Sequence, residues 1–294
     1  MATPDQPDAG AGAENPVPPA APLLATVPPG RDSWQGLRAL TDARIALGRA
    51  GGSLRTESLL EFRLAHAGAR DAVHTPFDLA GLEASLHAAG LETERLASRV
   101  TDKQTYLLRP DLGRKLAPAS IDRLEAARGL WGQRDLAILI SDGLAADAAH
   151  HHAAETVTEL ARILREAGWT LYPLFLVPYA RVKLQDAVGG LLGARHSVIL
   201  LGERPGLSAH DSLGAYLTFQ PGETRTDADR NCVSNIRAGG LPPSAAAQKL
   251  AELLIASRRL GLSGTALREE GGPTKIAPPS PGPDLRGVSG ADRQ

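Results

Sequence analysis

The chain has 294 residues, of which 43% are hydrophobic and only 4% aromatic, and its formal net charge is −1. This length predicts one or two domains, with a core packed mainly by aliphatic and small side chains. The near-zero charge provides no field that would attract nucleic acid or an anionic membrane, and the single cysteine, Cys232, excludes an internal disulfide.

The two ends of the sequence differ from its middle. Residues 1–30 are rich in Pro, Ala and Gly, and residues 263–294 in Gly, Pro and Ser, both without periodicity. Such segments bury too little apolar surface to fold, so we expect a disordered arm and a disordered tail. No apolar run approaches the ~20 residues of a membrane span, and no signal peptide is visible, so we expect a soluble, cytoplasmic protein.

Residues 31–100 show the spacing of amphipathic helices, which predicts a small helical N-terminal domain. Asp78 stands where it would cap one of these helices. The expected helices run from Trp34 to about Leu47, from Thr56 to about Ala67, and over 79–89.

Residues 101–262 alternate apolar runs with amphipathic helices, as in a parallel sheet covered on both faces. The expected strands cover 106–108, 136–140, 170–176, 197–201, 213–219 and 232–236. The expected helices cover 118–127, 147–167, 181–192 and 242–260. The predicted fold class is therefore α/β: a Rossmann-like (flavodoxin-like) parallel-sheet domain preceded by the small helical domain.

The turn Gly202-Glu203-Arg204-Pro205-Gly206 follows the expected strand 197–201 directly. Ligands of open α/β sheets bind at the carboxyl ends of the strands, where the loops diverge. We therefore expect Glu203 to face a ligand; the alternative is a salt bridge with Arg204 or Arg181.

Two other polar groups have alternative interpretations. Ser141-Asp142-Gly143 ends another expected strand and could face a ligand or form a turn that caps the next helix. Arg109 and Asp111 could clamp a substrate, but a surface ion pair or a contact with a partner chain is the simpler interpretation.

The common enzyme signatures are absent: the sequence contains no G-x-G-x-x-G, no P-loop and no G-x-S-x-G. The run His150-His151-His152 does not predict a metal site, because consecutive helical residues point about 100° apart. His151 and Glu155 could share an ion, but a solvated helix face explains them better. Cys232 has no adjacent histidine, so we expect neither a catalytic residue nor a metal ligand in this chain.

Six blocks of the sequence resemble the small (light) subunit of ethanolamine ammonia-lyase. They are TDARIALGRAGGSLRTESLLEFRLAHAGARDAVH, TDKQTYLLRPDLGRKL, LAILISDGLAADA, RVKLQDAVGGLLGA, LLGERPGL and ADRNCVSNIRAGGLPPSAAA. They lie in the family's order and extend over about residues 35–260, nearly all of the expected folded part.

This resemblance implies an adenosylcobalamin-dependent lyase that converts ethanolamine to acetaldehyde and ammonia by a radical mechanism. The substrate and radical sites belong to a large TIM-barrel subunit, and the small subunit helps to hold the corrin between the two chains, in a hetero-oligomer. Carried over by motif, the cobalamin contacts are Val182 in ARVKL, Glu203 in LGERPG and Cys232 in DRNCVSN.

The resemblance also implies a base-on cofactor without a histidine of this chain on cobalt, because no D-x-H-x-x-G is present. The corrin periphery is a ring of amides, which favours backbone groups and a carboxylate such as Glu203. Some members of the family are packed into bacterial microcompartments by a short amphipathic N-terminal helix, a pattern that residues 1–30 lack. The competing hypothesis is a stand-alone Rossmann-like module that binds a nucleotide or a corrinoid without catalysis; an independent dehydrogenase is disfavoured by the missing glycine motif.

Overall fold

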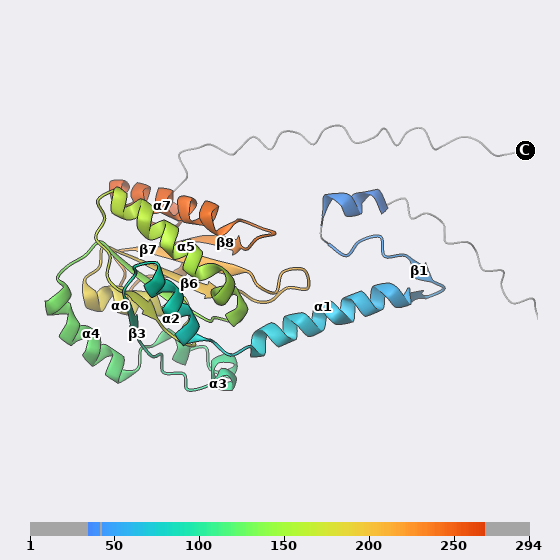
Figure 1. The fold of residues 1–294 in the computed structure, drawn as a ribbon, viewed down its shortest axis with the longest axis horizontal. Coiled ribbons are helices and arrows are strands. Elements are labelled where there is room, and N and C mark those ends of the chain that lie inside the picture. Colours follow the sequence, from blue (N-terminus) through green and yellow to red (C-terminus); the bar gives the residue numbers. More distant parts are fainter. Residues whose placement is uncertain (1–34, 42, 268–294) are drawn as a thin grey trace, which may run out of the picture. The chain divides into compact units, whose positions relative to one another are not determined.

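The computed structural model describes residues 35–41 and 43–267 (Figure 1), so the expectations for 1–30 and 268–294 lie outside the described residues. The chain divides into two units, Met1–Leu59 and Leu60–Gln294, which are described separately here. Within the described ranges, no helix has the length and the apolar run needed to cross a membrane.

The described part of the first unit contains little regular structure. It has a 3₁₀ helix, η1 (Gln35–Leu40), and an antiparallel pair of short strands, β1 (Arg49–Ala50) and β2 (Ser53–Leu54). The expected helix up to Leu47 is wrong, because Ala46 and Gly48 take positive φ angles of 51° and 69°, which an α-helix does not allow.

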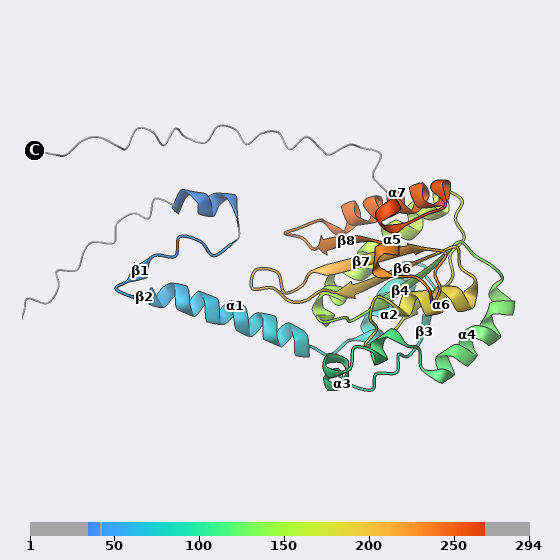
Figure 2. The same cartoon turned by 180° about the vertical axis from the view of Figure 1, so that it is seen from behind.

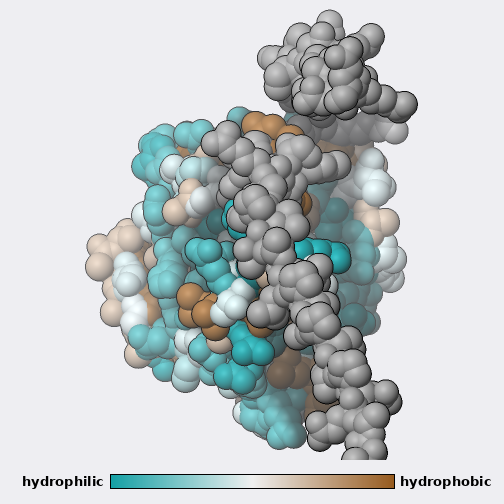
Figure 3. All heavy atoms as spheres, turned by 90° about the vertical axis from the view of Figure 1, so that its right-hand side faces the viewer, coloured by the Kyte–Doolittle hydropathy of each residue, from teal (hydrophilic) through white to brown (hydrophobic). Residues whose placement is uncertain are grey.

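Helix α1 (Thr56–His74) starts in the first unit and continues into the second, where Leu60 and Leu64 are 58% and 76% exposed. The exposed apolar residues do not form one continuous patch on the face that Figure 3 shows. There, brown apolar residues form separate small groups between teal polar ones, where grey atoms do not cover them.

A six-stranded sheet in the order β3-β5-β4-β6-β7-β8 forms the centre of the second unit. The first four strands of this order are parallel, whereas β7 and β8 run antiparallel to their neighbours. The α/β class is confirmed, but the sheet is mixed and not wholly parallel. The strands are β3 (Thr93–Arg95), β4 (Leu136–Ser141), β5 (Leu174–Leu176), β6 (His196–Gly202), β7 (Leu213–Phe219) and β8 (Arg230–Ile236).

Helices cover both faces of this sheet, as the alternation of apolar runs predicts. One apolar cluster joins the sheet to α2 (Leu79–Ala88), α5 (Ala146–Glu166) and α7 (Pro243–Leu260), and Figures 1 and 2 show α5 and α7 side by side. A second cluster joins the other face to α4 (Pro118–Trp131) and α6 (Leu184–Leu192). Helix α2, capped by Asp78 as expected, and strand β3 thus belong to the layers of the sheet, although they fall within the range expected for a separate helical domain.

Three expected elements differ from the structure for local reasons. Residues 106–108 form the end of helix α3 (Lys103–Leu108) and not a strand, because the side chain of Asp102 caps that helix by accepting from Thr105 N–H at 2.8 Å. The strand expected over 170–176 is shortened to β5, because Pro173 has no N–H to donate. The helix expected from Arg181 begins three residues later, so Val182 lies in a turn.

The short helices η2 (Leu112–Arg114), η3 (Asp227–Asp229) and η4 (Gly264–Ala266) belong to connecting segments. The last of them extends the packed chain to Leu267, which is buried. Asn231 fixes it by donating to Gly264 O at 3.1 Å and accepting from Gly264 N–H at 2.7 Å.

A buried ion pair joins α6 to β8. Both terminal nitrogens of Arg230 donate to the carboxylate of Asp186 at 2.8 Å, and the two side chains are only 3% and 1% exposed. Two-pronged pairs of this kind fix orientation as well as distance. The pair therefore sets how the last strand of the sheet lies against α6.

We expect Asp186→Asn to destabilise the chain by about 3 kcal/mol, because the buried charge of Arg230 would keep only the exposed carboxylate of Asp227 as a counter-charge. The free energy of unfolding in urea measures this effect, with Asp122→Asn on the exposed side of α4 as the control. A loss below about 1 kcal/mol, as surface pairs give, would contradict the role of the pair.

His196 gives a second, pH-dependent prediction. Its fully buried ring lies between Trp169 and Phe219, with Nε2 3.1 Å from Ser257 Oγ, and burial lowers its pKa from 6.5 to about 4. The unfolded state then takes up a proton at a higher pH than the folded state. Stability should be complete above pH 6.5 and should fall as the pH drops towards 4, by on the order of 2 kcal/mol between pH 7 and pH 5.

The matched variant for this effect is His196→Phe, which keeps the aromatic packing. Unfolding at pH 7 and pH 5 should show a smaller loss for the variant than for the wild type. Equal losses would mean that other groups cause the pH dependence.

Candidate functional site

The candidate site lies on the sheet face that α4 and α6 cover only in part. Tyr216 of β7 and Cys232 of β8 are cross-strand partners, and Tyr216 packs at the edge of the apolar cluster beneath α6. Both side chains line a pocket of about 840 Å³, together with Val182 and several cationic residues. The antiparallel strands thus provide the floor of a pocket whose wall comes from the turn before α6.

The loop after β5 carries Val182, and the end of β4 holds this loop in place. Asp142 Oδ1 accepts from Tyr179 N–H at 2.7 Å, and Ser141 Oγ accepts from Ala180 N–H at 3.0 Å. Tyr179 takes a positive φ of 57°, which is unfavourable for a tyrosine and requires such support. The end of β4 therefore determines where Val182 lies.

Asp142 is an anchor for this loop. Its side chain is 2% exposed, and burial raises the pKa of its carboxyl group, which Lys103 Nζ approaches at 3.6 Å. Neither Ser141 nor Asp142 lines the pocket or occupies the N-cap of α5, which is Ala145. The interpretation as a helix cap is therefore wrong, and both side chains instead hold the loop after β5.

Cys232 is exposed, yet its surroundings keep it protonated. Partial burial of the thiol raises its pKa, and the negative charge of Glu203 adds to this effect, whereas a hydrogen bond with Tyr216 opposes it. Burial raises the pKa of Tyr216, and Cys232 and the negative charge of Glu203 add to this effect. A nucleophilic cysteine needs a lowered pKa, so this one is a neutral hydrogen-bonding group.

Glu203 follows β6 and lies next to the pocket without being one of its lining residues. Its Oε2 accepts from Ser212 Oγ at 2.5 Å and from Asn235 N–H at 3.4 Å. A Cβ at Gly214 would lie only 2.8 Å from Glu203 Oε1, so this glycine leaves room for the carboxylate. Among the described residues Glu203 forms no ion pair, so the expected alternative of a salt bridge with Arg204 or Arg181 is wrong.

The usual crevice at the carboxyl ends of the central strands is closed here. Leu144 N–H donates to Gly202 O at 2.9 Å, which joins the loop after β4 to the end of β6. A Cβ at Gly143 would lie 2.3 Å from Gly202 O, so the two backbones touch. The pocket consequently lies beside this position, over β7 and β8.

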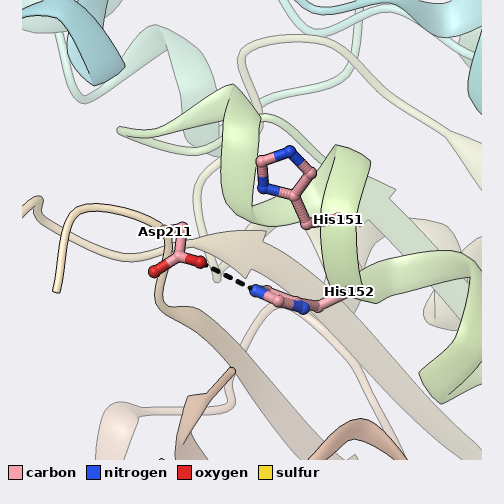
Figure 4. A group of neighbouring side chains, drawn as sticks. All are labelled: His151, His152 and Asp211. Carbon is pink, nitrogen blue, oxygen red and sulfur yellow. Dashed lines mark hydrogen bonds and ion pairs between the residues drawn. The ribbon is translucent and has the colours of Figure 1, made fainter. Parts of the chain in front are cut away.

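The three histidines of α5 have separate surroundings. His150 Nε2 accepts from Asp78 N–H at 2.8 Å, and His152 Nε2 lies 3.2 Å from Asp211 Oδ2. Figure 4 shows His151 and His152 on the helix, with Asp211 reaching His152 from the β6–β7 loop. His151, His152 and Asp211 offer ligand atoms within 4.8 Å of one another, but the pair of His152 and Asp211 is explained by fixing that loop to α5.

Arg109 and Asp111 form a two-pronged surface pair with distances of 2.9 Å and 2.8 Å. Both side chains are at least half exposed, and only Asp111 lines the pocket. The interpretation as an ion pair is confirmed.

Sequence reasoning missed several residues of the pocket. The sequence around Tyr216 indicates only a strand. Tyr216 lies at the site because β7 and β8 pair in a register that places it opposite Cys232. The cations Arg114 and Lys115 follow a glycine in a short turn, a weak signal without the neighbouring segment 179–183.

The chain matches the family model described as ethanolamine ammonia-lyase light chain over residues 31–268. It is 50% identical over 246 residues to the ethanolamine ammonia-lyase small subunit of Xanthomonas campestris pv. campestris, covering 83% of this chain and 90% of the relative. The small subunit of Azotobacter vinelandii is 51% identical over 83% of this chain and 90% of the relative. That of Ralstonia nicotianae is 51% identical over 81% of this chain and 89% of the relative. Because the family model matches residues 31–268 and a relative is 50% identical over 83% of this chain, the chain belongs to the ethanolamine ammonia-lyase light-chain family.

Proposed function

We propose that this chain is the small subunit of an adenosylcobalamin-dependent ethanolamine ammonia-lyase and that its pocket holds one edge of the corrin. A large subunit would carry the substrate site and enclose the cofactor from the other side. The assembled enzyme would convert ethanolamine to acetaldehyde and ammonia in the cytoplasm, either free or inside a microcompartment.

One observation carries this proposal. Val182 and Cys232, carried over from two separate family motifs, line the same pocket, and the charge of Glu203 reaches the Cys232 thiol. These residues lie up to fifty positions apart in the sequence and come from three different segments. Two of them line one pocket and the third acts on the Cys232 thiol beside it, which supports a common ligand.

The chemistry of these groups fits a corrinoid. The corrin periphery presents amides, which both donate and accept, together with apolar methyl groups. Val182 offers apolar surface, the neutral Cys232 and Tyr216 offer weakly polar contacts, and Glu203 offers a carboxylate to amide N–H groups. An open pocket of about 840 Å³ suits the edge of a large ring better than a small enclosed substrate.

When bound, adenosylcobalamin supplies the radical chemistry of such lyases. In our proposal this chain orients the cofactor and contributes no proton transfer of its own. Tyr216 and Cys232 suit that role, because raised pKa values keep both groups neutral beside the corrin. We propose that the cofactor is bound base-on, with a lower ligand that comes from the cofactor itself.

We further infer that the sheet is of the Rossmann-like, flavodoxin-like type. Strand β4 lies between β5 and β6, with α5 packed on one face and α6 on the other. This is the doubly wound arrangement, and β7 and β8 extend it. The cobalamin-contacting domain would then include α2 and β3 as well as residues 101–262.

Reconstitution tests the proposed function. Ethanolamine with adenosylcobalamin should yield ammonia and acetaldehyde when this chain and its large subunit are combined, and nothing with this chain alone. A well-formed, cofactor-loaded complex that released neither product would contradict the proposal. Full activity of the large subunit without this chain would contradict the shared site.

The role of Glu203 can be measured separately. In the assembled complex, we expect Glu203→Ala to weaken adenosylcobalamin binding about tenfold, the equivalent of losing one charge-assisted hydrogen bond, while the unfolding midpoint changes little. Glu203→Gln, which can still accept from Ser212, should lose less affinity.

Equilibrium titration followed by absorbance measures both variants, with Glu155→Ala on the exposed side of α5 as the control. An unchanged dissociation constant of adenosylcobalamin for Glu203→Ala would mean that this residue does not contribute to cofactor binding.

A further inference from the structure

The pocket contains more positively charged side chains than binding of the neutral amides of the corrin periphery would require. Six cationic side chains line it and only two carboxylates, in a chain whose net charge is −1. The cations are Arg114, Lys115, Arg181, Lys183, Arg225 and Arg230; the carboxylates are Asp111 and Asp227.

Half of these cations are neutralised within the fold. Arg230 and Lys183 both contact the carboxylate of Asp186, the latter at 3.1 Å, and Arg225 lies 3.7 Å from Asp229. Of the two lining carboxylates, Asp111 binds Arg109 and Asp227 contacts Arg230.

The other three cations have no carboxylate within ion-pair distance among the described residues. Arg114 and Lys115 are exposed on the turn that contains η2, and they also line the adjoining cavity of about 630 Å³. Arg181 is half-buried, and its buried Nε has no hydrogen-bond partner. An unsatisfied buried donor is costly, so the guanidinium of Arg181 keeps donor capacity that the chain itself does not use.

The backbone brings these three side chains together. Arg181 N–H donates to Gly113 O at 2.8 Å, and a Cβ at Gly113 would lie 2.9 Å from both Arg181 Cγ and Tyr179 O. The guanidinium of Arg181 lies 3.9 Å above the ring of Tyr106 and donates to Tyr106 O at 2.9 Å. The turn with Arg114 and Lys115 is therefore fixed against the segment that carries Val182.

We propose that Arg114, Lys115 and Arg181 form an anion subsite that binds the phosphodiester of the cobalamin nucleotide tail. This inference rests on the proposed function. The phosphodiester is the one anionic group of cobalamin, whereas the corrin side chains are neutral amides. Arginine matches phosphate oxygens with two parallel donors, and lysine adds a compact charge, so this set suits a phosphodiester.

The test uses the assembled complex and two probes, adenosylcobalamin and adenosylcobinamide, of which the second lacks the phosphodiester and the nucleotide. The variant is Arg114→Gln with Lys115→Gln, two exposed changes that leave the core intact. Its control is Arg162→Gln with Arg165→Gln on exposed positions of α5, which removes the same charge from the opposite face of the sheet. Equilibrium titration by absorbance or calorimetry gives the dissociation constants.

We expect the variant to bind adenosylcobalamin about ten to a hundred times more weakly, while its affinity for adenosylcobinamide changes less than about threefold. Added salt should weaken adenosylcobalamin binding to the wild type more than adenosylcobinamide binding. Single Arg181→Lys and Arg181→Gln variants should show the same selectivity, with Lys the milder change.

Other outcomes would overturn the inference. Equal losses for both probes would mean that the cations serve the corrin or the shape of the pocket, and no loss for either would leave them without a role in cofactor binding. Weaker assembly with unchanged cofactor affinity would assign them to carboxylates of the large subunit. A wild-type complex that binds neither probe would instead refute the proposed function, and this inference with it.

Discussion

The candidate site depends on the anchoring of one loop by the end of one strand. Ser141 ends β4 and Asp142 follows it, and their side chains accept from the N–H groups of Ala180 and Tyr179, respectively. Together with Ser98 Oγ, which donates to Tyr179 O at 3.3 Å, these bonds support the strained backbone at Tyr179. The turn that carries Arg181 and Val182 therefore owes its position to buried polar groups that never reach the pocket.

The mixed sheet explains why the pocket is found where it is. Between β4 and β6 the glycines 143 and 202 let two backbones touch, which closes the crevice that doubly wound sheets normally use. The antiparallel strands β7 and β8 continue the sheet beyond α6, and their face towards that helix layer provides the pocket floor. The buried pair of Arg230 and Asp186 then ties the last strand to α6.

Sequence patterns predicted much of this fold because its central strands are unusually apolar. The residues 136–140 and 197–201 could be recognised as buried strands, and both are. The failures have local causes that periodicity does not reveal: the capping of α3 by Asp102, the positive φ at Ala46 and the antiparallel direction of β7. Strand direction in particular depends on pairing between distant segments.

The candidate site was predictable only in part. Neither Val182 nor Cys232 stands in a sequence pattern that indicates a ligand, and family resemblance alone selected them. Glu203 was suggested by its loop, yet its hydrogen bonds with Ser212 and Asn235 could not be foreseen, because they require the fold of β7 and β8. The excess of cations was invisible for the same reason: Arg114 and Arg181 are 67 positions apart in a chain of balanced charge.

Cys232, the only cysteine of the chain, allows the most direct test of the account, since it is exposed and lines the pocket. Alkylation of Cys232 in the assembled complex, located by mass spectrometry, should be followed with and without adenosylcobalamin. Mildly alkaline pH is suitable because the pKa of the thiol is raised. A cofactor that lies in this pocket should slow the labelling strongly, with no effect once the complex is denatured. Equal labelling rates with the cofactor demonstrably bound would mean that cobalamin lies elsewhere.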